Sequence, residues 1–235
     1  MTIPGGETMD LTGGVAGCYF GAHPAVVTDV ADPDGQGRVR VRLPWSPDSG
    51  GSAYQAWARL ATLMAGSGRG SWFVPDVDDE VLVLFEGGDP RRPYVVGSLW
   101  NGVDSPPESM DAAGANHLKV LRSRNGVTIT LDDHDGREKL TLSTPGGQSV
   151  VLEDGPGKIT VRDSNGNSVE LGAGGIRLTS GATVTVEASE LKVTAGMVTV
   201  DAGMSKFSGA VKADAAVITN SVVGASYTPG AGNIW

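Results

Sequence analysis

The sequence predicts an all-β protein in which a small barrel is followed by a ladder of short strands. Apolar residues recur at every second position over most of the chain, which is the period of a strand with one buried face. Glycine and proline, 35 and 13 of the 235 residues, cluster between the apolar runs and favour tight turns. In the second half the apolar pairs lie roughly seven to ten residues apart, too close for helices to cross between parallel strands.

The chain begins with residues 1–17, rich in Gly and Thr, which we interpret as a flexible or docking arm. Disorder in the isolated chain is the favoured interpretation. Residues 18–103 then contain longer runs with strand character. The clearest of them places Val39, Val41 and Leu43 on one face and three arginines on the other. Five strands with glycine at the corners fit a small, partly open barrel of the OB type. The predicted strands are 25–30, 38–45, 56–61, 81–85 and 93–100.

Residues 121–220 are predicted to be the ladder, after a Ser-, Pro- and Ala-rich linker over 104–120. Its inward side chains are small, and Phe207 is the one aromatic residue in the ladder, so a single chain offers only a thin apolar face. The predicted core residues are Val127, Ile129, Leu131, Leu140, Leu142, Val150, Leu152, Ile159, Val161, Val169, Leu171, Ile176, Leu178, Val184, Val186, Leu191, Val193, Val198 and Val200.

The spacing alone leaves an ordinary antiparallel meander open for this ladder. The thin apolar face favours a different arrangement, in which identical chains wind together, bury every inward face and close every edge. The predicted fold of residues 121–220 is therefore an intertwined triple-stranded β-helix, the needle of a homotrimer.

The C-terminal segment 221–235 ends in apolar residues after Pro and Gly, which is unusual for a merely frayed tail. Three copies would present these residues around one axis. We expect the segment either to dock a cap or to fold back and plug the needle. The residues predicted to do so are Tyr227, Pro229, Asn233, Ile234 and Trp235.

No catalytic, cofactor-binding or metal site is predicted from the sequence. His23, His117 and His134 lie far apart in the sequence without the spacing of metal ligands. The single Cys18 excludes an intrachain disulfide and is interpreted as a small packing residue. The acids Asp132, Asp133 and Asp135 could be glycosidase acids or calcium ligands, but a solvated turn is the favoured interpretation.

Two motifs of the barrel region could bind phosphate or nucleic acid. The segment Gly66–Gly70 lacks the lysine and the following helix of a phosphate-binding loop. Arg38, Arg40 and Arg42 could form an oligonucleotide-binding face on the barrel, as OB domains commonly do. The net charge of −9 disfavours nucleic acid as a partner, so a barrel exterior or a subunit contact is the favoured interpretation of these arginines.

Neither a signal peptide nor a transmembrane segment is expected. Residues 1–10 have no basic start followed by an apolar run, and no stretch approaches the roughly 20 apolar residues of a membrane span. Synthesis in the cytoplasm is therefore the expectation.

Three segments of the barrel region strongly resemble the OB domain of the VgrG and phage baseplate V-protein family. They are DPDGQGRVRVRLPW at 32–45, FVPDVDDEVLV at 73–83 and GGDPRRPYVVGSLWNG at 87–102. The ladder segments NGVTITLDD at 125–133 and DSNGN at 163–167 resemble the region after the OB domain in that family. The resemblance implies an OB collar that leads into a trimeric needle, the central spike of contractile injection systems: phage tails, type VI secretion systems and extracellular tail-like particles.

The same resemblance implies the partners. Long members of the family begin with a hub module, whereas about 17 residues precede the OB domain here, so a separate hub protein is expected at the OB end. A PAAR-type tip protein is expected at the C-terminal end. The needle would contact the target-cell envelope mechanically, without enzymatic activity, within a phage-tail-like particle. The alternative function is a trimeric β-helical tailspike enzyme that acts on polysaccharide.

Overall fold

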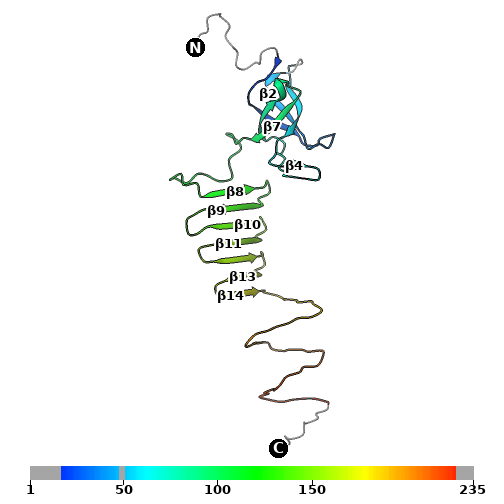
Figure 1. The fold of residues 1–235 in the computed structure, drawn as a ribbon, viewed down its shortest axis with the longest axis vertical. Helices are drawn as coiled ribbons and strands as arrows, with labels where there is room; N and C mark the ends of the chain where they lie inside the picture. The colour runs from blue at the N-terminus through cyan, green and yellow to red at the C-terminus, as the bar shows by residue number, and fades with distance from the viewer. Residues whose placement is uncertain (1–16, 48–50, 226–235) are drawn as a thin grey trace, which may run out of the picture. The chain divides into compact units, whose positions relative to one another are not determined.

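The computed structural model describes residues 17–47 and 51–225, and the predicted arm and tip residues Tyr227, Pro229, Asn233, Ile234 and Trp235 lie outside them. The chain divides into two units, Met1–Thr183 and Val184–Trp235. The described residues contain β-strands and no α-helix, so the all-β prediction is confirmed (Figure 1).

Five strands close into a barrel in the order β1-β2-β3-β7-β6, and each matches one of the five predicted strands. All neighbours run antiparallel except β3 and β7, which pair in parallel at Arg59↔Tyr94 and Leu60↔Val95. This parallel pair closes the barrel, which the sequence predicted to be partly open. The strands are β1 (His23–Asp29), β2 (Val39–Pro47), β3 (Ala53–Leu60), β6 (Glu80–Phe85) and β7 (Pro93–Ser98).

The barrel has its own apolar core, built from the inward positions of these strands. The predicted alternation is confirmed, because Val39, Val41 and Leu43 are almost fully buried. Aromatic rings cover one end of the core, where His23 stacks on Trp45 with ring centroids 4.6 Å apart. The buried apolar residues are Ala25, Val27, Val39, Val41, Leu43, Ala58, Val81, Val83, Phe85 and Val95.

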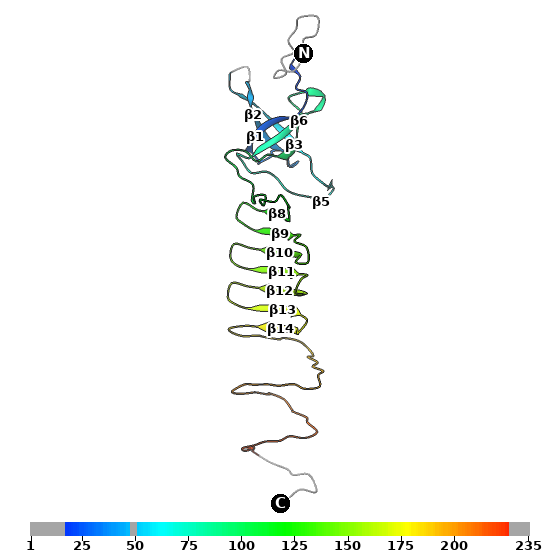
Figure 2. The ribbon, with the colours of Figure 1, turned by 90° about the vertical axis from the view of Figure 1, so that its left-hand side faces the viewer.

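A two-stranded arm leaves the barrel between β3 and β6. It consists of β4 (Ala65–Gly66) and β5 (Arg69–Gly70), which pair antiparallel. Figures 1 and 2 both show this arm extending away from the barrel wall.

Residues 118–179 form a single seven-stranded sheet in which each strand pairs antiparallel with the next (Figure 2). The antiparallel meander that the spacing left open is thus the arrangement that one chain forms. The sequence pattern also missed the first strand, which begins at Leu118. The strands are β8 (Leu118–Arg122), β9 (Thr128–Asp132), β10 (Lys139–Ser143), β11 (Ser149–Glu153), β12 (Lys158–Arg162), β13 (Ser168–Gly172) and β14 (Gly175–Thr179).

Short turns with fixed hydrogen bonds set the register of this sheet. In the turn between β12 and β13, the Asp163 carboxylate accepts hydrogen bonds from the backbone N–H groups of Asn165 and Asn167 at 2.9 and 2.8 Å. Gly166 adopts φ +85°, a left-handed conformation that costs other residues energy. Such turns leave each strand five residues long and keep its apolar positions aligned with those of its neighbours.

The second unit is described up to residue 225, and no strand forms within 184–225. The sequence predicted strands here, because Val184, Val186, Leu191 and Val193 keep the two-residue period. All four of these side chains are exposed. A strand requires a pairing partner, and the described residues of this chain supply none for 184–225.

Candidate functional site: the apolar face of the β8–β14 sheet

The strand register brings the predicted core residues of the ladder into two straight rows across one face. Residues directly opposite each other in an antiparallel pair share a face, so each row continues from strand to strand. The first row, from β9 to β14, is Leu131, Leu140, Leu152, Ile159, Leu171 and Ile176. The second is Ile129, Leu142, Val150, Val161, Val169 and Leu178, and β8 adds Leu121 to it.

The opposite face of the sheet is polar. A central row of mostly threonine and charged residues includes Thr130, Thr141 and Thr160. Beside it, charges alternate in sign across four neighbouring strands, in the order Asp132, Lys139, Glu153 and Lys158. Opposite charges in directly paired positions stabilise a sheet that faces water. The two faces therefore differ in polarity: one suits contact with water, and the other is apolar.

Within the described residues, nothing in the single chain covers the apolar face. None of the residues in the two rows is buried, and Ile176 at the last strand is 77% exposed. A contiguous exposed apolar surface of this kind marks an interaction site in a stable protein. Among the other predicted core residues, Val127 lies just before β9 and is half exposed. The rest belong to the second unit and are exposed there: Val184, Val186, Leu191, Val193, Val198 and Val200.

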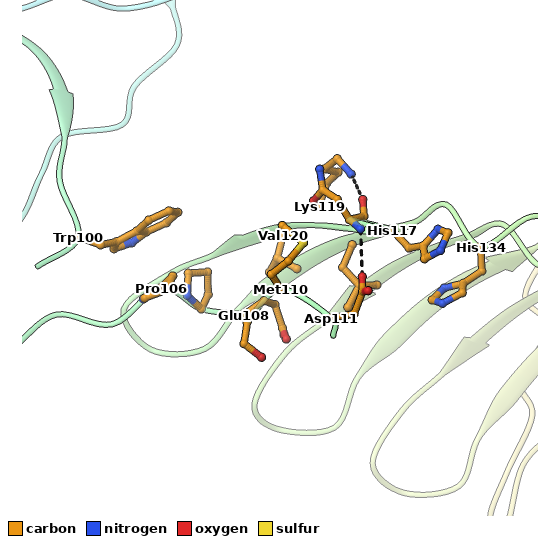
Figure 3. Close-up of a pocket in the computed structure, with 13 residues that line it drawn as sticks. Trp100, Pro106, Glu108, Met110, Asp111, His117, Lys119, Val120 and His134 are labelled. Atoms are coloured by element: carbon orange, nitrogen blue, oxygen red, sulfur yellow. Dashed lines mark hydrogen bonds between the residues drawn. The ribbon is translucent and has the colours of Figure 1, made fainter. Parts of the chain in front are cut away.

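The first hairpin of the sheet carries a histidine pair that was not predicted from the sequence (Figure 3). The rings of His117 and His134 stack with centroids 4.0 Å apart at an interplanar angle of 24°. The Asp132 carboxylate forms a hydrogen bond with His134, which is the main reason that the pKa of Asp132 is lowered. The pair was missed because it arises from the pairing of β8 with β9, where the Asp133 N–H donates to the His117 carbonyl at 2.9 Å.

This histidine pair lines a pocket of about 520 Å³ together with Trp100, Met110 and Val120. The described part of the chain contains no group of three or more His, Cys, Asp or Glu side chains placed to hold a metal ion. Two stacked imidazoles have lone pairs in parallel ring planes, so they do not converge on one metal position as zinc ligands do. Their arrangement supports a structural role at the start of the sheet.

Two of the remaining sequence candidates, Arg38 and Asp133, form local ion pairs. Arg38 pairs with Asp32 at 2.6 Å and with Asp34 at 2.5 Å, beside the turn that leads into β2. Of the acidic turn, Asp133 lies 3.6 Å from the Lys119 ammonium. Cys18 is a free, half-buried thiol.

A closed five-stranded barrel followed by a single-layer sheet with one uncovered apolar face is typical of a β-protein that assembles with other chains. Residues 23–100 match the family described as the type VI secretion system/phage-baseplate injector OB domain. Residues 139–206 match the phage baseplate V C-terminal trimerisation domain, which supports a homotrimer. The two matches together span well over half of the chain, which therefore belongs to the VgrG/phage baseplate V family.

Curated relatives agree with this assignment. The chain is 30% identical over 128 residues to the type VI secretion system spike protein VgrG1b of Pseudomonas aeruginosa, a match that covers 52% of this chain and 17% of the relative. It is 26% identical over 139 residues to the spike protein VgrG3 of Vibrio cholerae, covering 54% and 14%. It is also 26% identical over 128 residues to the actin cross-linking toxin VgrG1 of Vibrio cholerae, covering 50% and 12%.

The chain thus spans less than a fifth of the length of these relatives. Within residues 17–47 and 51–225, the structure has no helix of the length and hydropathy that a membrane crossing requires.

Proposed function

We propose that this chain is a structural spike at the baseplate centre of a contractile injection system. The observation that carries the proposal is the pair of apolar rows on an uncovered face of a one-layer sheet. Three such sheets from three chains, each turned with its apolar face inward, would form a closed prism with a continuous apolar core. The polar, charge-alternating faces would then be outside, in water.

The second unit has the same apolar period. Residues 184–225 keep the two-residue apolar period but find no strand partner among the described residues of their own chain. In the proposed spike they pair with the same segments of the two other copies, so that the chains wind around one another beyond the sheet. The proposed regions are an OB domain over 18–103, a linker over 104–117, a needle over 118–220 that begins with β8 and not at the predicted residue 121, and a tip segment over 221–235.

We also propose two partners, which the resemblance to the family suggests. A separate hub protein would hold the OB end, and a PAAR-type tip protein would sit on the C-terminal residues Ile234 and Trp235. Sheath contraction would drive the spike against a target envelope, a mechanical task that requires no active site in this chain. The spike would be made in the cytoplasm and would act within a phage-tail-like particle.

Native mass and negative-stain imaging of the purified chain test the proposal. The expected result is a species at three times 24.1 kDa that appears as a needle with a wider collar. A folded monomer that persists at micromolar concentration would contradict the proposal, because the apolar rows would then have no partner. Release of sugars from bacterial polysaccharides by the purified trimer would favour the tailspike enzyme instead.

A further inference from the structure

We infer that the β4–β5 arm of each OB domain binds a groove of the neighbouring copy, lined by the end of its OB domain and the start of its sheet, so that the copies meet outside the apolar rows as well. The arm comprises residues 61–73, nearly all of them exposed. The inference rests on the trimer of the proposed function, and it adds a contact that the two apolar rows do not supply.

The arm presents large apolar side chains to solvent. Leu63 is 99% exposed, Trp72 is 76% exposed, and Met64 and Phe73 are also more than half exposed. The barrel already has a complete core without them. Several exposed apolar side chains on one projecting element are typical of a protein contact rather than of a water-facing loop.

Hydrogen bonds hold the arm in one conformation, which favours docking. The Ser71 N–H donates to the Met64 carbonyl at 2.9 Å, and the Thr62 hydroxyl donates to the Ser71 carbonyl at 2.8 Å. At its base the Ala61 N–H donates to the Val95 carbonyl of β7 at 2.8 Å. At Gly70 a Cβ would lie 2.6 Å from the Met64 carbonyl oxygen, so the two arm strands approach each other more closely than a side chain allows. An arm held in one conformation loses little conformational entropy on binding.

A complementary groove of about 870 Å³ lies beside the open end of the β6–β7 hairpin. Its apolar lining is Val30, Val77, Leu99, Trp100 and Pro107, and Trp100 is 69% exposed. Its lining also contains four carboxylates against the guanidinium groups of Arg122 and Arg124. The groove therefore has both apolar and polar lining, and its carboxylates outnumber its guanidinium groups, of which Arg124 pairs with Asp76 at 2.6 Å.

Charge complementarity selects a second copy of the chain as the occupant. Arg69 is the single charged residue of the arm, and it is exposed near the arm's tip. An arm with apolar side chains and one positive charge complements a groove that has apolar residues and an excess of carboxylates. Three-fold symmetry requires contacts in which one surface of a copy meets a different surface of the next, and an arm and a groove on the same chain satisfy this requirement. Needle trimerisation raises the local concentration of both surfaces, so the contact need not be strong by itself.

Site-directed cross-linking tests the contact on the full chain. In a Cys18→Ser background, the pair Leu63→Cys and Val77→Cys should yield covalent dimers and trimers with a short bismaleimide at high dilution. The matched control, Leu63→Cys with Arg92→Cys, places the second thiol at the opposite end of the β6–β7 hairpin and should yield mostly uncross-linked chains. Arg69→Glu in the first pair should lower the yield several-fold, whereas Arg69→Lys, which keeps the charge, should not.

The native mass distinguishes failure of the arm contact from failure of the proposed function. A trimeric mass without cross-linking between chains, or with a cross-link confined to one chain, overturns the arm contact and leaves the proposed spike intact. A monomeric mass contradicts the proposed function itself. Equal yields from the groove pair and the control pair also overturn the contact, because the arm would then have no preferred position.

Discussion

At the scale of single residues, the carboxylate of Asp32 stabilises the turn that leads into β2. It accepts hydrogen bonds from the backbone N–H groups of Asp34, Gln36 and Arg38 and from the Arg38 guanidinium. Its side chain is 4% exposed. The Arg38 hydrogen bond is the largest cause that holds the pKa of Asp32 well below its usual range, with the backbone bonds adding to it. The recognisable DPDGQGR sequence thus has a structural explanation in one hydrogen-bonded carboxylate.

Asp32→Asn is expected to lower the melting temperature of the barrel by roughly several degrees at pH 7. An amide cannot form the ion pair with Arg38 and accepts fewer of the turn's N–H groups. Because the pKa is depressed in the folded state, the unfolded state binds more protons between the folded pKa and the usual carboxyl value of 3.8. The carboxylate's contribution is complete above the usual value and is lost as the pH falls below it.

Melting curves at pH 7 and at pH 3 therefore provide the measurement. The difference between Asp32→Asn and the unmodified chain should be large at pH 7 and smaller at pH 3. Asp135→Asn, on an exposed turn, is the control and should change neither curve. Equal destabilisation by Asp32→Asn at both pH values would show that shape rather than charge matters at this position.

At the scale of secondary-structure elements, substitutions on the two faces of β10 distinguish loss of the trimer interface from loss of the sheet's own stability. Leu142 lies in the second apolar row, and its sequence neighbour Thr141 points to the polar face. Leu142→Asp should abolish the trimer, since three carboxylates would enter the apolar core at a cost on the order of several kcal/mol per chain. Thr141→Asp changes the same strand on its solvent side and should leave the trimer intact.

Sedimentation of the two variants at several concentrations is the measurement. Monomeric Leu142→Asp beside trimeric Thr141→Asp is the expected result. A trimer in both variants would mean that the apolar rows do not form the interface, and a monomer in both would mean that β10 tolerates no charge on either face.

The strands of the ladder were predictable because a period of two reports which face is buried. The period does not report which strand pairs with which, so the sequence could not tell intrachain hairpins over 118–179 from winding between chains. The strand β8 was missed because Leu118 and Val120 come directly after a linker-like run. The sequence did not reveal the stacking of His117 on His134, because that contact forms only when β8 pairs with β9. The residue type alone also could not show that Trp72 is exposed and not part of the barrel core.

At the scale of the whole molecule, the two units differ in where their backbone hydrogen bonds are made. Residues 118–179 pair within one chain, whereas residues 184–225 have no strand partner among the described residues. Unpaired backbone N–H and C=O groups are costly once they are removed from water, so a needle built from 184–225 depends on the other two chains.

Amide hydrogen exchange on the full chain tests this dependence. In the trimer, the amides of 184–200 should exchange slowly, at rates approaching those of β9–β13, because interchain strands protect them. In the monomeric Leu142→Asp variant, the same amides should exchange at the rate of an unfolded chain, while the buried β1, β2 and β6 strands of the barrel remain protected. Fast exchange of 184–200 in a trimer of confirmed mass would show that the interchain assembly ends with the β8–β14 sheet.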